Sequence, residues 1–262
     1  MTFLVSLPFL LIASLVLAEP NQINLDAARF SMMEPGNIQP PWRVTGLRGR
    51  PRTEYRLVED GGKVVVEAQS SASVAALVWD LSLDPTEYPV IHWEWRVANL
   101  LESSDIATRK GDDFPARVYV TFDYDLRRLS WLARTKIRVA RLLYGDSVPA
   151  AALCYVWDRE APAGTVTRNA YTERVGMIVV ESGGERLNEW VPVTRNIYDD
   201  FVRAFQEEPP RISGVVLTTD TDDTGESARA WFGDVMLSVA PREVQSGLVP
   251  NQQEKDHDRP IE

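Results

Sequence analysis

Short runs of β-branched and aromatic residues, separated by turn signals, recur along most of the chain. In 90–97, apolar residues alternate with polar ones, which is the period of a half-buried strand. Two such runs flank Gly61 and Gly62, whose access to positive φ predicts a hairpin around 55–68. Further strands are expected near 75–83, 116–123, 151–158, 165–173, 175–181, 189–194, 211–219 and 228–239. About eleven strands with this spacing predict an all-β protein, an antiparallel β-sandwich of the jelly-roll kind.

Two segments have the period of a helix, and we expect both on the surface of the sandwich. In 197–207, Ile197, Phe201 and Phe205 share one face, and Asn196 is a candidate N-cap. The segment 126–144 carries six basic residues and no acidic one. Such a helix suits an anionic membrane surface or acidic glycans, and it also suits a surface helix that pairs with the protein's own carboxylates.

The N-terminus differs from the rest of the chain. Residues 4–17 are apolar and end at Ala18, a pattern typical of a cleaved signal peptide over 1–18. No other apolar run is long enough to span a bilayer. We therefore expect a secreted or periplasmic protein with one β-sandwich domain over 19–240. Residues 241–262 lack apolar periodicity, and we expect a disordered tail there.

Composition narrows the classes of function. The 262 residues include 38 acidic and 28 basic ones, for a net charge of −10 with neutral histidine. This acidic balance argues against nucleic acid as a partner. A single cysteine excludes an internal disulfide and a multi-cysteine zinc site, and it is expected in the core. The oligomeric state is left open.

Six strings, taken together and in order, resemble the bacterial family known as domain of unknown function 3047 (DUF3047). They occupy 92–97, 111–123, 153–158, 168–183, 194–205 and 219–235. The resemblance covers nearly all of the chain after the signal peptide. It implies a secreted or periplasmic domain without an established activity, so it leaves the function open.

The densest charge cluster follows a predicted strand at 211–219. Asp220, Asp222 and Asp223 lie within four residues and repel one another unless a cation or an arginine neutralises them. The order resembles the start of a calcium loop, but Trp231 stands where an EF-hand needs a carboxylate. We expect a Ca²⁺ site with Asp234 as a fourth ligand, or else a solvated turn whose side chains bond to local backbone.

The predicted strand 116–123 presents large hydrogen-bonding side chains on one face and apolar ones on the other. Similar polar faces occur at 90–97 and 151–158, and on one sheet they would form a concave surface of aromatics, arginines and carboxylates. Such surfaces bind sugars in jelly-roll proteins, whereas an ordinary solvated face is the alternative. The candidate ligand-binding residues are Asp112, Asp113, Arg117, Tyr119, Tyr155, Trp157, Tyr171 and Arg195.

The same surface could support catalysis. A glycosidase needs two carboxylates, whereas a polysaccharide lyase uses tyrosine or histidine to take a proton and arginine to neutralise a uronate. The candidates are His92, Glu94, Arg117, Tyr119 and Asp123. Our leading hypothesis is binding of a carbohydrate or another envelope component, with a polysaccharide-degrading enzyme as the alternative. A third hypothesis is a structural envelope protein that docks on an anionic surface through 126–144.

Overall fold

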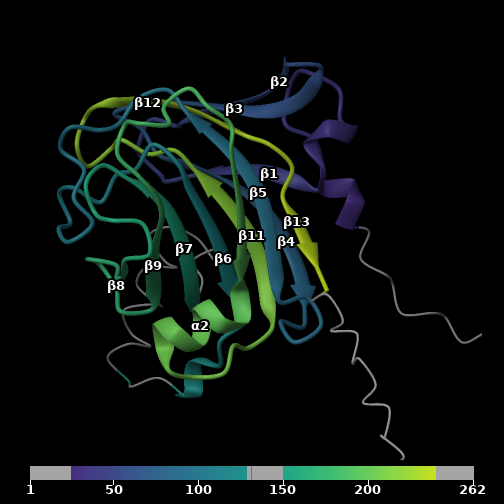
Figure 1. The fold of residues 1–262 in the computed structure, drawn as a ribbon, viewed down its shortest axis with the longest axis vertical. Helices are drawn as coiled ribbons and strands as arrows, with labels where there is room; N and C mark the ends of the chain where they lie inside the picture. The colour runs from purple at the N-terminus through teal and green to yellow at the C-terminus, as the bar shows by residue number, and fades with distance from the viewer. Residues whose placement is uncertain (1–24, 129–130, 132–149, 240–262) are drawn as a thin grey trace, which may run out of the picture.

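The computed structural model describes residues 25–128, 131 and 150–239, which form two β-sheets (Figure 1). In spatial order, the seven-stranded sheet contains β1 (Trp42–Gly46), β4 (Ala75–Leu83), β11 (Ile212–Thr218), β6 (Arg117–Phe122), β7 (Ala151–Asp158), β9 (Val175–Ser182) and β8 (Val166–Arg168). The six-stranded sheet contains β10 (Val191–Asn196), β5 (Val90–Val97), β12 (Ser227–Phe232), β3 (Lys63–Ser71) and β2 (Glu54–Asp60), with β13 (Met236–Ser238) also paired to β5.

This arrangement confirms the predicted all-β sandwich. The expected signal peptide and tail lie outside the described residues, and so does the basic segment 126–144 apart from Trp131 and a 3-10 turn, η3 (Leu126–Arg128). Two further 3-10 turns, η1 (Leu25–Ala28) and η2 (Phe30–Met32), precede β1. Within the described part of the chain, no helix is long and apolar enough to cross a membrane.

The structure corrects the expected strands in several places. Strand β1 was not expected, and the strand expected at 165–173 is reduced to the three residues of β8. The pair β7–β9 is parallel, because β8 runs antiparallel at the sheet edge and the chain then turns back in the direction of β7. The run 228–239 forms two strands, β12 and β13. Phe232 pairs with Trp95 and Met236 pairs with His92, so three residues of one strand oppose two of the other. This extra residue makes a bulge that divides the run.

Large aromatic residues fill the space between the sheets. Trp93 and Trp95 of β5 face Tyr155 and Trp157 of β7, with ring centroids 5.2 Å apart for Trp93–Tyr155 and 6.0 Å for Trp95–Trp157. All four are buried in one continuous core, whose apolar area supplies most of the stabilisation. The prediction that Tyr155 and Trp157 face a ligand is therefore wrong.

A second, smaller apolar cluster covers part of the outward side of the seven-stranded sheet. Phe114 packs there on Cys154 and Val156 of β7 and on Met177 and Val179 of β9. Strand β7 is consequently buried on both faces. Burial raises the pKa of the Cys154 thiol to about 12, which fits the expected core role of this cysteine.

The helix α2 (Ile197–Phe205) lies across one end of the seven-stranded sheet (Figure 1). It begins as predicted, since the Asn196 side chain accepts a hydrogen bond from the Asp199 N–H at 3.1 Å. Phe201 and Phe205 face the core. Gly176 on β9 permits the close approach of Ala204, because a Cβ at Gly176 would stand 2.8 Å from the Ala204 Cβ.

Candidate functional site

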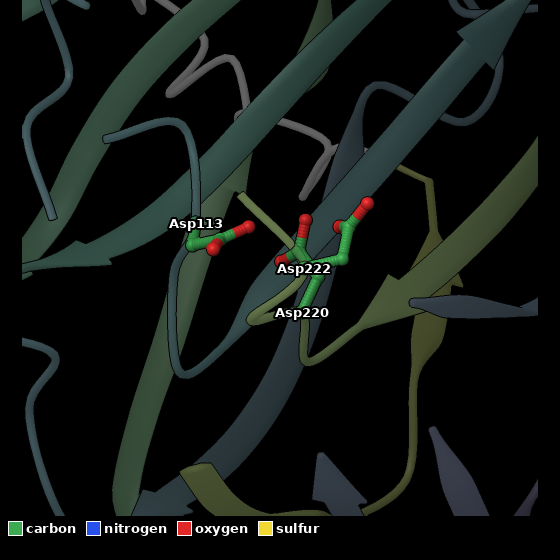
Figure 2. Close-up of side chains that lie close together, drawn as sticks. All are labelled: Asp113, Asp220 and Asp222. Carbon is green, nitrogen blue, oxygen red and sulfur yellow. The ribbon is translucent and has the colours of Figure 1, made fainter. Parts of the chain in front are cut away.

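Three carboxylates meet where two loops approach each other at one end of the seven-stranded sheet. Asp113 precedes β6, whereas Asp220 and Asp222 follow β11, the strand that pairs with β6. One oxygen from each residue lies within 4.8 Å of the other two. Figure 2 shows the three side chains converging from these two segments.

The Asp113 side chain is held from one side only. Its Oδ2 accepts hydrogen bonds from the backbone N–H groups of Asp223 at 2.9 Å and Thr224 at 2.6 Å. Its Oδ1 is buried and has no hydrogen-bond partner among the described residues. Asp113 itself is fully buried, with 0% of its surface exposed. Burying a carboxylate oxygen without a hydrogen-bond partner costs free energy of folding. The position of this oxygen beside two more carboxylates therefore requires an explanation.

Arg117 binds two of the neighbouring carboxylates. Its Nε and Nη2 donate to Asp220 at 3.0 and 2.6 Å, and its Nη1 donates to Asp112 Oδ1 at 3.1 Å. Asn169 donates to the other oxygen of Asp112 at 2.9 Å. Burial lowers the pKa of Arg117, but Asp220, Tyr119, Asp112 and Cys154 together outweigh this, and the net pKa lies well above its ordinary value. Arg117 is therefore a buried charge held by its own carboxylate partners, and it is not available to bind a ligand.

Carboxyl groups outnumber basic side chains around this cluster, and burial makes their charged forms costly. Burial raises the pKa of Asp220 to about 8 even though Arg117 opposes the shift. The pKa values of Asp113 and Asp222 also rise, mainly through burial. Only Arg117 and Arg50 of the described residues lie within ion-pair distance of the five carboxylates here, which are Asp112, Asp113, Asp220, Asp222 and Asp223. The oxygen-only donor set and the surplus of carboxyl groups suit a hard divalent cation.

Two of the four expected metal ligands do not belong to this group. The Asp223 carboxylate accepts a hydrogen bond from the Tyr171 hydroxyl at 2.9 Å, and Arg109 lies over the Tyr171 ring. Burial and the adjacent Asp223 raise the pKa of Tyr171 to about 12. Asp234 lies beyond the other end of β12 and bonds to Ser31, so the prediction that it completes the site is wrong.

A groove of about 510 Å³ occupies the outward face of the seven-stranded sheet beside this cluster. Its lining combines aliphatic side chains with hydroxyls and carboxylates. The buried Thr218 Oγ1 has no hydrogen-bond partner among the described residues. The side chains that line it include Ala76, Val78, Asp80, Tyr119, Thr121, Asp123, Ala152, Ser213, Val216, Thr218 and Asp220. None of the groove's described lining residues is lysine, arginine or histidine.

The polar face of β5 does not join this groove. His92 belongs to the six-stranded sheet, where its ring nitrogens contact the Thr194 and Ser238 hydroxyls at 2.9 and 3.0 Å. Glu94 on the same strand pairs with Lys63. The predicted joint surface of β5 and β6 is therefore wrong, because β5 pairs with β10, β12 and β13 and lies in the other layer. His92 and Glu94 cannot act together with Arg117, Tyr119 and Asp123.

Arg195 also has a structural partner. It donates to Asp200 at 2.8 Å, and the Tyr155 hydroxyl donates to the same carboxylate at 3.0 Å. Asp200 is buried at the start of α2, so this triad fastens the helix to the sandwich. Neither Arg195 nor Tyr155 reaches the groove or the acidic loop, which removes both from the expected ligand-binding set.

Several groove residues gave no clear signal in the sequence. Val78 and Val216 lie within apolar runs whose alternate positions form the core, so their outward direction was hidden. Thr218 and Ser213 looked like ordinary strand residues. A strand with apolar residues on both faces could have indicated them. The outward apolar residues of such a strand lie either under another segment of the chain or in a groove.

The model of the family described as "Protein of unknown function (DUF3047)" matches residues 40–236. The search of the curated proteins finds no match.

Two solved structures have weakly similar folds. One is the "Cellulose induced protein, Cip1", at 12% identity and a TM-score of 0.34, covering 78% of this chain and 93% of that one. The other is a β-1,2-glucanase from Parabacteroides distasonis, at 10% identity and a TM-score of 0.30, covering 76% of this chain and 24% of that one. Likenesses of this size have no bearing on function, so the residues of the groove and the cluster must supply it.

Proposed function

We propose that this chain, which belongs to the family described as protein of unknown function (DUF3047), is a binding protein that takes a neutral saccharide into the groove. The observation that carries this proposal is the composition of the groove. Aliphatic side chains lie among hydroxyls and carboxylates on the outward face of a sheet. A sugar ring has apolar C–H faces and a rim of hydroxyls, so it complements both parts.

The aliphatic and the polar residues of the groove lining would contact different parts of a saccharide. Val78, Val216 and Ala152 offer a flat aliphatic surface for the ring of a saccharide. The Asp123 carboxylate lines the groove and is exposed, so it is available to accept a hydrogen bond from a sugar hydroxyl. Each hydrogen bond adds about 1 kcal/mol in net terms, and it also fixes the orientation of the ligand.

The charge of the groove favours a neutral ligand over an acidic one. Three carboxylates line the groove, and although Asp80 pairs with Arg43 and Asp220 with Arg117, Asp123 is not balanced by a basic side chain of the described lining. A uronate would meet repulsion there, whereas a neutral sugar would find hydrogen-bond acceptors. A lyase acting on uronates needs a basic group at the site, and His92 and Arg117 do not supply one. We therefore favour binding over the enzyme alternative.

Affinity electrophoresis and calorimetry on neutral and uronate-containing polysaccharides test this proposal. Val216→Trp would fill the centre of the groove, and Val202→Trp, on the exposed side of α2, is the matched control. We expect retention by a neutral glycan, a loss of at least about tenfold in affinity for Val216→Trp, and little change for Val202→Trp. Retention by uronates alone, equal losses in the two variants, or no retention on any neutral glycan would each overturn the proposal.

The proposal includes a location outside the cytoplasm, which the apolar run before Ala18 supports. Cell fractionation with N-terminal sequencing of the full-length product is the test. We expect secreted or periplasmic protein that begins at Glu19. Protein that stays in the cytoplasm with its N-terminus intact would contradict this part. The third hypothesis, docking through 126–144, stays a prediction because that segment lies almost wholly outside the described residues.

A further inference from the structure

The structure assigns a Ca²⁺ site to Asp113, Asp220 and Asp222, in the space between the loop before β6 and the loop after β11. We propose that one cation bridges the three carboxylates and fixes the two loops to each other. The site differs from the expected one, since Asp113 takes the place of Asp223 and Asp234. It stands independently of saccharide binding, because its ligands are brought together whether or not the groove is filled.

The geometry of the three oxygens fits a single ion. Oxygens bound to one Ca²⁺ at 2.3–2.6 Å lie at most about 5 Å apart. The three candidate oxygens all lie within 4.8 Å of one another, and Figure 2 shows the Asp113 carboxylate directed at the other two. An ion between them therefore needs only small shifts of the side chains.

The unpartnered oxygen of Asp113 is the independent sign of a ligand. Two backbone N–H groups hold Asp113 Oδ2, which fixes the carboxylate in place. The fixed carboxylate leaves Oδ1 buried without a donor among the described residues. A cation bound through Oδ1 would satisfy this oxygen and leave the two hydrogen bonds at Oδ2 intact. A simple solvated turn would not bury an unsatisfied carboxylate oxygen at this position.

The surrounding bonds leave room for a cation. Each Asp220 oxygen accepts one hydrogen bond from Arg117 and keeps a further lone pair. Asp222 has only a distant ion pair, with Arg50 Nη1 at 3.8 Å from its Oδ2. Three carboxylates favour Ca²⁺, which accepts irregular geometry and many oxygens, over Mg²⁺, which retains its water and uses one or two carboxylates.

The position of Asp220 gives the site a consequence for the groove. Asp220 contributes to the groove lining, and it is also the residue through which Arg117 joins the cluster. A cation held by Asp220 would fix the end of the groove and reduce the negative charge there. Saccharide affinity should then rise when Ca²⁺ is present, although Ca²⁺ binding itself does not depend on any saccharide.

Calorimetric titration of the EDTA-treated chain with CaCl₂, in parallel with MgCl₂, tests the assignment. We expect one Ca²⁺ per chain, weaker binding of Mg²⁺, and a higher melting temperature in Ca²⁺ than in EDTA. Asp222→Asn removes one ligand charge at the residue least involved in internal bonds. Asp223→Asn is the matched control, because its carboxylate bonds to Tyr171 instead.

Each outcome decides the matter. A loss of at least about tenfold in Ca²⁺ affinity for Asp222→Asn, with Asp223→Asn close to the parent chain, supports the site. Equal losses in both variants would indicate diffuse attraction by an acidic surface and would overturn it. The absence of heat and of any melting shift at millimolar Ca²⁺ would overturn it as well. None of these readouts involves a glycan, so failure here is distinct from failure of saccharide binding.

Discussion

The outward faces of the two sheets carry similar residue types and use them in opposite ways. On the six-stranded sheet, three acid–base pairs join residues of different strands, and Arg96 lies close to the rings of both Trp190 and Trp231. The pairs there are Lys63–Glu94, Arg96–Asp60 and Arg229–Glu67. The seven-stranded sheet instead has a groove, an unpartnered hydroxyl and a surplus of carboxylates.

This difference between the two sheets indicates which polar strand faces are candidates for ligand binding. On the six-stranded face, cation–π contacts and ion pairs occupy the charged groups of Lys63, Arg96 and Arg229. The seven-stranded face leaves buried acceptors without donors, which is the state that a ligand relieves. Alternating polar residues alone cannot separate these cases. What separates them is whether the neighbouring strands bring the complementary charge.

Substitution of Arg117 should have the largest effect on stability. Arg117→Met leaves Asp220 and Asp112 buried without their cation, which we expect to cost about 3–5 kcal/mol in the free energy of unfolding. Urea unfolding at neutral pH measures this loss. Arg229→Met on the other sheet is the control, because its ion pair with Glu67 is half exposed and should be worth about 1 kcal/mol or less. Similar losses in both variants would erase the contrast between the faces.

An intermediate effect of opposite sign is expected at Thr218. Thr218→Val keeps the shape of the side chain and removes a buried hydroxyl without a partner, so the chain should gain about 1 kcal/mol. The adjacent Thr219 donates to the Pro115 carbonyl at 2.9 Å, and Thr219→Val should cost about 1–2 kcal/mol. Melting curves of the two variants decide this point. A Thr218→Val variant that loses stability would show that the hydroxyl already has a partner.

The smallest effect concerns Glu67 and depends on pH. Burial raises the pKa of Glu67, but hydrogen bonds from Arg229 and Gln69 outweigh it and the net pKa lies below the ordinary 4.5. A depressed pKa stabilises the fold above 4.5, and this contribution disappears as the pH falls through the folded-state pKa. Glu67→Gln should cost less than about 1 kcal/mol at pH 7. In urea unfolding from pH 7 to pH 3, the difference between the variant and the parent should shrink; a constant difference would contradict this origin.

The sequence predicted the strands well because their periods are local. The strands 75–83, 90–97 and 151–158 have the predicted bounds, and the cap at Asn196 forms as expected. Local patterns say little about which strands become neighbours. The polar faces of β5 and β6 were therefore combined on one sheet, although the chain places them on different layers.

The candidate site shows the same limit at the level of single residues. Asp220 and Asp222 were indicated by their spacing, since both belong to one loop. Asp113 was expected to bind a ligand, but its role beside Asp220 depends on the pairing of β6 with β11, which spacing cannot reveal. Tyr155 and Trp157 were misplaced because β7 is apolar on both faces and gave no indication of which face is inward.

The bond from the Thr224 N–H to Asp113 joins residues 111 positions apart in the chain. Contacts of such long sequence separation close large loops, and proteins that depend on them fold slowly. Since Asp113 comes just before β6 and Thr224 comes after β11, this bond forms only once those strands have paired. The acidic loop thus takes its final shape late in folding. A ligand of the acidic loop would therefore bind only those chains in which the sandwich is complete.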